Sequence, residues 1–134
     1  MLDTTLIILK PDAVKRKLTG EIISRIERKN LTIHRMDMRT LDKETLDKHY
    51  DEHKEKGFYS ELVDFMTSGP VVVMEVRGRD AQMAMRNIIG STDPLTAEAG
   101  TIRGDLGILF TENLIHGSDS PESAAREIEI FFGD

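Results

Sequence analysis

Residues 68–77 read SGPVVVMEVR, and this stretch decides the fold because it contains the clearest strand of the sequence. Ser68, Gly69 and Pro70 end the helix expected before them, since glycine and proline are poor helix formers. The apolar, β-branched run from Val71 to Arg77 then predicts a strand. The elements on either side of this central strand decide which sheet it joins.

The sequence begins with a strand and a helix. A continuous apolar run at residues 5–10 (TLIILK) predicts a strand buried on both faces, which ends before Pro11, where a loop is expected. A helix is expected over residues 21–29, capped by Thr19. Asn30 is suited to the left-handed conformation that ends helices.

A second strand and two helices are expected before the central strand. Residues 31–39 (LTIHRMDMR) alternate imperfectly, which predicts a strand with a bulge. A polar helix is expected from Asp42 toward His53, and a second short helix over residues 60–67. Together these two helices form a helical hairpin inserted between strands.

The C-terminal part predicts a helix, a long loop, a last strand and a closing helix. Asp80 is expected to cap a helix that Gly90 ends, and residues 92–104 form a loop long enough to indicate function. Residues 105–110 predict the last strand. Ser120 and Pro121 start the closing helix.

The predicted class is therefore α+β: a ferredoxin-like βαββαβ antiparallel sheet with helices on one face, an inserted helical hairpin and a C-terminal helix. A length of 134 residues suits a single domain spanning residues 1–134. This fold alone indicates no function, since it occurs in regulatory modules, RNA binders and enzymes.

The composition excludes several classes of function. The chain has no cysteine, which excludes disulfides, a thiolate nucleophile and a cysteine zinc site. No apolar run approaches the roughly 20 residues that cross a bilayer, so we expect no membrane association and a cytoplasmic location. A net charge of −6 argues against specific nucleic-acid binding, and an anionic ligand must meet a local cluster of cations.

The segment NLIHGSD, residues 113–119, is dense in reactive groups. The imidazole of His116 can attack phosphorus near neutral pH without a separate base. Gly117 lets the backbone approach a ligand closely, while Ser118 and Glu127 can orient the ring. By itself the segment also fits an ordinary turn.

The same segment resembles the active-site signature of nucleoside diphosphate kinases: an Asn, two variable residues, then His-Gly-Ser-Asp. The similarity continues in order through LKPDAV, GEIISRIE, HYDEH, FMTSGPVVVMEV, RNIIGSTDP, GTIRGD and SPESAAREI. It implies reversible ping-pong transfer of a γ-phosphoryl group between nucleoside tri- and diphosphates through a phosphohistidine at His116. It also implies broad acceptance of bases and sugars.

The resemblance assigns roles to residues spread over the whole chain. The catalytic residues it implies are His116, Lys10, Tyr50, Ser118 and Glu127. The residues implied to bind the nucleotide are Lys10, Phe58, Leu62, Arg86, Thr92, Arg103, Phe110 and Asn113. Phe58, Leu62 and Phe110 would form an apolar slot in which the base stacks, although core packing explains Leu62 and Phe110 equally well.

The resemblance further implies a cofactor and an assembly. Mg²⁺ would be held mainly by the nucleotide phosphates, with Asp119 as a possible protein contact. ATP would be the usual donor, and the chain would form a homo-oligomer, in which a hexamer is favoured over a tetramer. The chain departs from the commonest family pattern at Ala13, Asn30, Gly57 and Ala99.

Three other functions stay open at this point. A phosphohistidine carrier needs the histidine but no nucleoside slot, a regulatory module needs neither, and an RNA binder needs exposed strand aromatics. The histidines of HYDEH, His49 and His53, have the spacing of a metal pair on a helix. We interpret them as part of a solvated helix face, and we assign no site role to His34.

Overall fold

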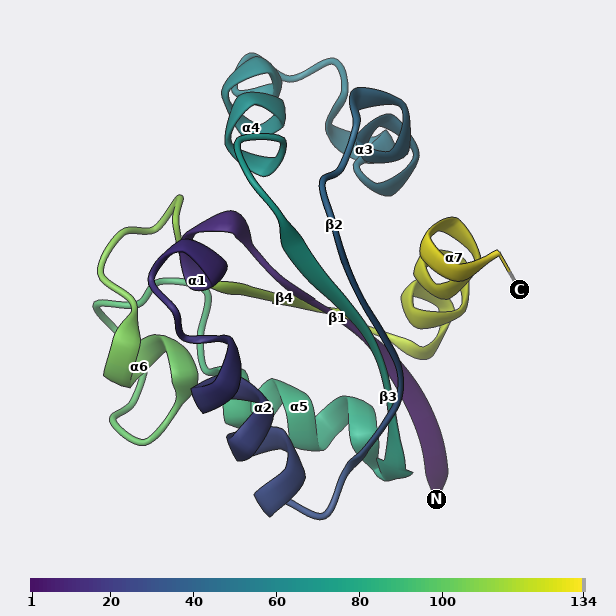
Figure 1. The fold of residues 1–134 in the computed structure, drawn as a ribbon, viewed down its shortest axis with the longest axis vertical. Coiled ribbons are helices and arrows are strands. Elements are labelled where there is room, and N and C mark those ends of the chain that lie inside the picture. Colours follow the sequence, from purple (N-terminus) through teal and green to yellow (C-terminus); the bar gives the residue numbers. More distant parts are fainter. Residues whose placement is uncertain (134) are drawn as a thin grey trace.

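The computed structural model describes residues 1–133, which contain one antiparallel four-stranded sheet (Figure 1). The strands are β1 (Leu2–Leu9), β2 (Thr32–Arg39), β3 (Val71–Arg79) and β4 (Ile115–Gly117), in the order β2-β3-β1-β4. The helices are α1 (Pro11–Lys15), α2 (Thr19–Arg28), α3 (Lys43–His49), α4 (Tyr59–Met66), α5 (Ala81–Ile89), α6 (Ile102–Leu106) and α7 (Pro121–Phe132), with a 3-10 turn at Asp51–His53. The predicted antiparallel βαββαβ arrangement is confirmed.

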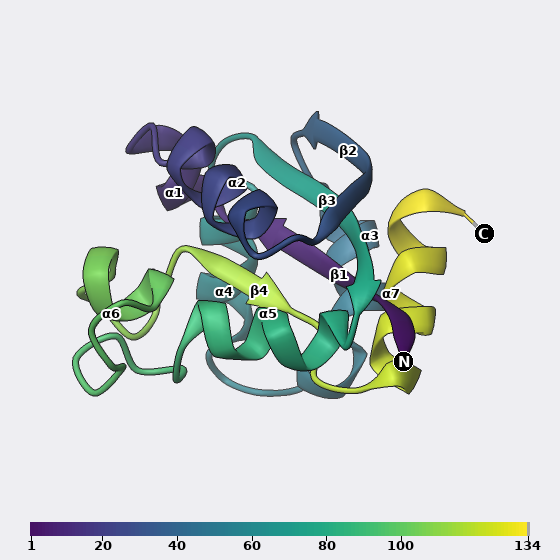
Figure 2. The same ribbon diagram turned by 90° about the horizontal axis from the view of Figure 1, so that it is seen from below.

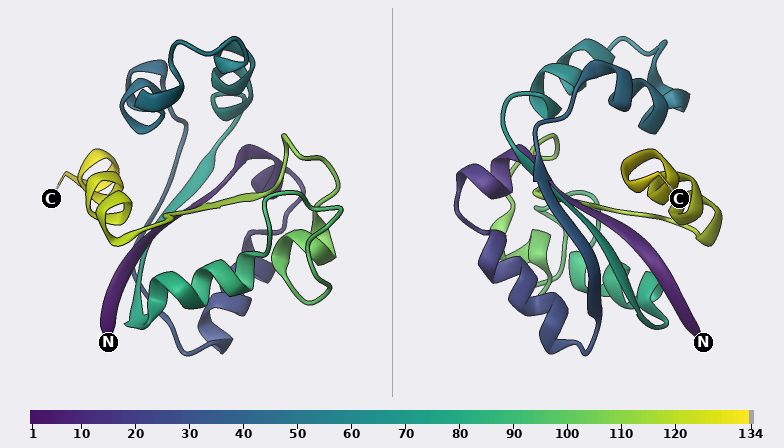
Figure 3. Two further views of the ribbon diagram at one scale, coloured as in Figure 1. Left: turned by 180° about the vertical axis from the view of Figure 1, so that it is seen from behind. Right: turned by 45° about the vertical axis from the view of Figure 1, so that its right-hand side comes forward.

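Helices cover both faces of this sheet (Figures 2 and 3). On one face, Ile7 and Leu9 of β1 pack with residues of α2 and α5, as predicted. On the other, Leu6 and Ile8 pack with residues of α3, α4 and α7, which the prediction of helices on one face did not include. Burial on both faces explains why β1 is apolar at consecutive positions.

The prediction of a last strand at residues 105–110 is wrong. Residues 102–106 form helix α6, whose first turn is capped because the Gly104 N–H donates to Thr101 Oγ1 at 2.9 Å. The fourth strand is the three-residue β4, which pairs with β1 so that His116 lies opposite Ile8. This difference places His116 in the sheet rather than in a loop.

Several predicted helix ends and irregularities are confirmed. Asn30 has a φ of 63°, and β2 contains the expected bulge, as a register shift between Ile33 and Arg35. The side chains of Asp42 and Ser120 cap α3 and α7 by accepting hydrogen bonds from backbone N–H groups.

Three local predictions are wrong. Pro11 starts helix α1 rather than a loop, because proline is favoured at the first helical position. Thr19 is the first residue of α2, whose N-cap is Leu18. Asp80 lies at a φ of 52° and its side chain does not cap α5; the carboxylate of Asp3 accepts from the N–H of Ala81 instead.

Within residues 1–133, no helix has the length and apolar character needed to span a bilayer.

Candidate active site

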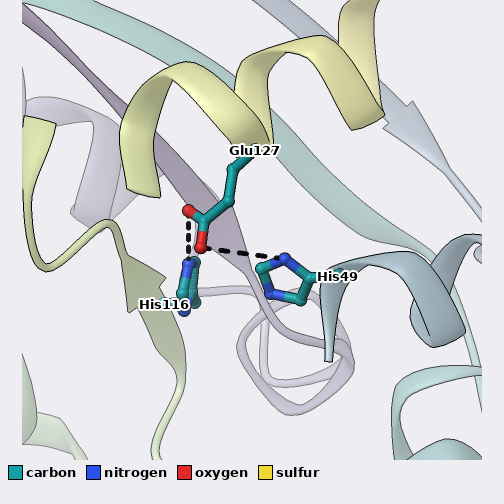
Figure 4. A group of neighbouring side chains, drawn as sticks. All are labelled: His49, His116 and Glu127. Atoms are coloured by element: carbon teal, nitrogen blue, oxygen red, sulfur yellow. Dashed lines mark hydrogen bonds and ion pairs between the residues drawn. The ribbon is translucent and has the colours of Figure 1, made fainter. Parts of the chain in front are cut away.

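His116 lies on β4 with its ring held from one side by Glu127 of α7 (Figure 4). Nε2 of His116 is 2.9 Å from Oε1 of Glu127, and the imidazole side chain is 22% exposed. Within residues 1–133, no hydrogen bond joins Nδ1 of His116 to another group. One ring nitrogen is therefore anchored and the other is available.

Glu127 is the centre of a small polar network under the sheet. Ser118 Oγ donates to Oε1 of Glu127 at 2.7 Å, and the backbone N–H of Leu6 donates to Ser118 Oγ at 3.2 Å. Burial alone would raise the pKa of Glu127, but the hydrogen bond and charge of His116, together with Ser118, outweigh burial and lower it.

An ionised Glu127 determines which nitrogen of His116 carries the proton. A carboxylate only accepts hydrogen bonds, so Nε2 must donate its N–H to Oε1. The neutral ring then has its lone pair on Nδ1. This arrangement agrees with the predicted orienting roles of Ser118 and Glu127.

His49 contradicts the interpretation of HYDEH as a solvated helix face. The residue is only 4% exposed, and its ring lies edge-to-face with that of His116, with centroids 4.8 Å apart. Burial, and then the proximity of His116, lower the pKa of His49 to about 3, so its ring is neutral near pH 7. The sequence signal was the spacing of Leu46 and His49, which places both on the buried face of α3.

The three predicted phosphate-binding cations lie around the strand that carries His116. Lys10 Nζ donates to Asn113 Oδ1 at 2.8 Å, and Arg86 Nη1 lies 3.4 Å from the Gly117 carbonyl oxygen. Arg103 donates to the backbone carbonyls of Asn113 and Ile115 at 3.2 and 2.6 Å. The acidic chain thus gathers its cations at one place.

The pKa values of these cations show that they influence one another. Burial, and then the charge of Arg103, lower the pKa of Lys10 to about 8. Burial, and then the charge of Arg86, lower the pKa of Arg103 to about 10. Cations held close enough to lower one another's pKa are typical of an anion-binding site.

Asp12 is a residue to which the sequence analysis assigned no role. Its Oδ2 accepts a hydrogen bond from the N–H of Leu114 at 3.1 Å, and the N–H of Lys10 donates to the Leu114 carbonyl at 2.9 Å. Leu114 has a φ of 75°, a conformation that a leucine rarely adopts. These two hydrogen bonds hold the turn between Asn113 and His116. In the sequence, the only indication of this role was the position of Asp12 within the LKPDAV segment.

Gly117 has a packing role that differs from the one predicted. A Cβ added there would lie 2.7 Å from Cδ1 of Ile89 on α5, and Gly117 is itself buried. A larger residue at this position would have to displace the end of the Ile89 side chain, so β4 and α5 pack closely here. The closer approach of a ligand to the backbone at Gly117 stays a prediction.

A cavity of about 230 Å³ opens beside the imidazole. Its lining includes His116, Glu127, His49, Tyr50 and Asp119, so two further predicted residues, Tyr50 and Asp119, reach the same space. Burial, and then the charge of Glu127, raise the pKa of Tyr50, which stays protonated. Lys10, Arg86 and Arg103 are not among the lining residues.

The remaining predicted nucleotide residues are less closely gathered. Thr92 is exposed, and its carbonyl accepts from Asn113 Nδ2 at 3.2 Å. Phe58 and Phe110 are 51% and 59% exposed, and no ring contact within residues 1–133 joins them. Leu62 packs against the core cluster on the α7 face, as the core-packing alternative predicted.

The chain is similar over nearly its whole length to proteins of one known family. The family model described as nucleoside diphosphate kinase matches residues 3–134. A nucleoside diphosphate kinase of Thermobifida fusca is 54% identical, covering 99% of this chain and 98% of that one. The enzyme of Streptomyces coelicolor is 58% identical, with 98% and 97% covered.

Solved structures give the same result. The nucleoside diphosphate kinase of Encephalitozoon cuniculi superposes with a TM-score of 0.95 at 42% identity, covering 98% of this chain and 90% of that one. The halophilic enzyme of Halobacterium salinarum, solved with CDP, has a TM-score of 0.96 at 43% identity, with 100% and 90% covered. The chain belongs to the nucleoside diphosphate kinase family.

Proposed function

We propose that this nucleoside diphosphate kinase transfers the γ-phosphoryl group through Nδ1 of His116. The observation that carries the proposal is the pairing of Nε2 with the ionised Glu127, which leaves the lone pair of the neutral ring on Nδ1. The reaction is the family's ping-pong exchange between nucleoside tri- and diphosphates.

In the first half of the cycle, Nδ1 attacks the γ-phosphorus, the bond to the bridging oxygen breaks, and the diphosphate leaves with that oxygen. The ring keeps its proton on Nε2 and becomes positively charged, and Glu127 stabilises this charge at 2.9 Å. In the second half, a different diphosphate attacks the phosphohistidine and the steps reverse. No proton needs to leave the ring at any stage.

Lys10, Arg86 and Arg103 would stabilise the oxygens of the transferring group. Phosphoryl transfer is catalysed mainly by positioning and electrostatics, and guanidinium groups bind phosphate oxygens in pairs. Arg103 uses part of its donor set on the carbonyls of residues 113 and 115, so it also positions the strand. Protonated Tyr50 can donate a hydrogen bond to a phosphoryl oxygen in the cavity.

The chain fits a magnesium ion that arrives with the nucleotide. Asp119 is exposed, lines the cavity beside His116, and offers one carboxylate, which suits an ion held mostly by phosphates and water. When bound, Mg²⁺ would neutralise charge on the polyphosphate.

For the nucleoside, we propose that the ribose contacts Asn113, that Thr92 binds a phosphate oxygen, and that the base stacks against Phe58 with Leu62 and Phe110. A slot that stacks bases without reading their edges accepts all of them. The CDP bound to the Halobacterium salinarum enzyme is consistent with pyrimidine acceptance. A coupled assay with ATP as donor and ADP-free preparations of GDP, CDP, UDP and dTDP tests this, and turnover of one diphosphate alone would contradict it.

We also propose that residues 1–134 act as one domain of a cytoplasmic homo-oligomer, a hexamer rather than a tetramer. Edge strand β2 carries Met36 and Met38, which are 54% and 57% exposed, and unpaired edge strands with apolar side chains favour self-association. Analytical ultracentrifugation measures the assembly, and cell fractionation the location.

Substituting Glu127 tests the orienting role. Glu127→Gln keeps the size of the side chain but removes the charge that stabilises the imidazolium, so we expect kcat to fall about 10- to 100-fold with a smaller change in KM. Steady-state rates at saturating ATP and GDP measure it. An exposed acid on the same helix, Glu129, supplies the control Glu129→Gln, which should keep the wild-type rate. Equal rates for both variants would exclude the role.

The lowered pKa of Lys10 predicts how the activity falls at alkaline pH. With a pKa of about 8, its charge is lost from the free enzyme as the pH rises through that value. We therefore expect kcat/KM, which reports free-enzyme ionisation, to decline above about pH 8. Lys10→Arg keeps its charge and should move the decline upward, whereas an unchanged profile would contradict the assignment.

The lowered pKa of Lys10 also makes stability depend on pH, in the opposite direction to activity. Because the folded state lowers the pKa of Lys10, folding disfavours the charged amine, and this penalty is fully present below about pH 8. Stability should accordingly rise slightly as the pH increases from about 8 toward the unfolded value of about 10.4.

A further inference from the structure

The buried ring of His49 is the polar group that the proposed reaction leaves unexplained. Neither Nδ1 nor Nε2 has a hydrogen-bond partner within residues 1–133, although the residue is 4% exposed. Buried polar atoms are nearly always paired, so two free nitrogens on one ring indicate a ligand or a functional use. The ring is positioned by its neighbours instead, edge-to-face against Tyr50 and Phe131.

His49 directs Nδ1 toward the same carboxylate that holds His116 (Figure 4). Nδ1 of His49 is 3.8 Å from Oε2 of Glu127, too far for a hydrogen bond but near the separation of two ligands that share a metal ion. Nε2 of His116 lies 2.9 Å from Oε1, and one ligand atom from each of the three residues lies within 4.8 Å of the others.

Two imidazoles and one carboxylate are a ligand set of the kind that zinc uses with an open fourth position. With zinc bonds of about 2.1 Å, two ligands of a tetrahedral site lie about 3.4 Å apart. The ligand atoms here lie within 4.8 Å of one another, so the widest pair must close by up to about 1.4 Å. The cavity of about 230 Å³ that these residues line provides water access for the fourth position.

The charges around the cavity favour a cation overall. Glu52 and Asp119 line it together with Glu127. Arg126 opposes them, with Nη2 3.9 Å from Oε2 of Glu127, and the charge of Lys10 also reaches His49. Arg126 has a 47% exposed side chain and can turn toward solvent when a cation binds.

We propose that His49, His116 and Glu127 form a binding site for Zn²⁺ or a similar borderline-soft cation, and that this ion inhibits phosphoryl transfer. The inhibition rests on the proposed role of His116. To bind a metal, Nε2 must lose its proton and coordinate the ion through its lone pair. The single proton of the neutral ring is then on Nδ1. The proton thus moves from Nε2 to Nδ1 through solvent, and Nδ1 no longer has a lone pair with which to attack phosphorus.

The site discriminates between metals by ligand chemistry. Mg²⁺ prefers oxygen ligands in an octahedron and arrives on the nucleotide phosphates, whereas two of the three ligands here are imidazole nitrogens. We expect magnesium to support transfer, while zinc bound through the two imidazoles and Glu127 opposes it.

Binding is measured directly on the full chain, without nucleotide. Zn²⁺ is titrated against a chromophoric chelator, and Co²⁺ supplies an optical spectrum that reports coordination number. We expect one ion per chain, a tetrahedral cobalt spectrum, and affinity weakened at least about tenfold in His49→Phe, which preserves ring packing. His34→Phe, an exposed histidine on β2, should bind like the wild type.

Inhibition is measured as the rate of phosphohistidine formation from γ-labelled ATP, with free zinc held by a nitrilotriacetate buffer so that chelation by ATP does not change it. Zinc should slow labelling of the wild type, and His49→Phe should need about ten times more zinc for the same effect. Equal zinc affinity in wild type and His49→Phe overturns the site. Zinc bound through His49 without slower labelling overturns the inhibition. If the metal-free enzyme shows no labelling, the proposed function is wrong. The zinc titration can still be interpreted in that case, because it is done without nucleotide.

Discussion

Replacing His116 with alanine is expected to abolish phosphohistidine formation and to lower turnover at least about 10⁴-fold, because no other group replaces the nucleophile. Ser118 donates a hydrogen bond to the same carboxylate, Glu127, at 2.7 Å and is 1% exposed, so it cannot take over the attack. Initial rates with ATP and GDP in a coupled assay measure the loss.

The control for this variant is His34→Ala, which removes an exposed histidine from β2 and should leave the rate unchanged. Alanine at residue 116 also removes one hydrogen bond from the buried carboxylate of Glu127, so thermal unfolding is measured on both variants. A folded His116→Ala chain with more than a few per cent of the wild-type rate would exclude the mechanism.

Arg103→Ala is expected to have the second largest effect, because it removes a cation and a structural clamp together. Loss of one preorganised donor to the transferring group lowers kcat about 10²- to 10³-fold. The carbonyls of Asn113 and Ile115 also lose their charged donor, so the free energy of unfolding should fall by about 3 kcal/mol. Steady-state kinetics and chemical denaturation measure the two effects.

Arg103→Lys separates these contributions. Lysine keeps the positive charge but cannot reproduce two guanidinium bonds to the carbonyls, so activity should recover more than stability does. Arg79→Ala, an exposed arginine at the end of β3, should change neither. Wild-type activity in a stable Arg103→Ala chain would remove Arg103 from the phosphate-binding cluster.

Much of the fold could be predicted because its long elements carry strong local signals. The apolar runs of β1 and β3 and the cap of α7 at Ser120 needed no tertiary information. Helix α6 has five residues and β4 has three, too few for a periodic pattern to form. The pairing of His116 with Ile8 depends on the order of the strands, which no local pattern contains.

The candidate site was predicted in composition more fully than in geometry. The resemblance supplied Lys10, Arg86 and Arg103, and the structure places them around one strand although 93 residues separate the first from the last. Asp12 and His49 were missed because their roles depend on contacts with Leu114 and Glu127, far away in sequence. His49 lies on the buried face of α3 with Leu46, and a polar residue at such a position indicates a functional role.

The most direct test is to label the chain with γ-³²P-ATP and with ¹⁵N in its histidines, and then to locate the phosphoryl group. We expect acid-labile, base-stable phosphate on His116, with the phosphorus bonded to Nδ1 in the NMR spectrum, and its quantitative transfer to added GDP or CDP. Phosphate bonded to Nε2, on another residue, or retained when diphosphate is added would contradict it.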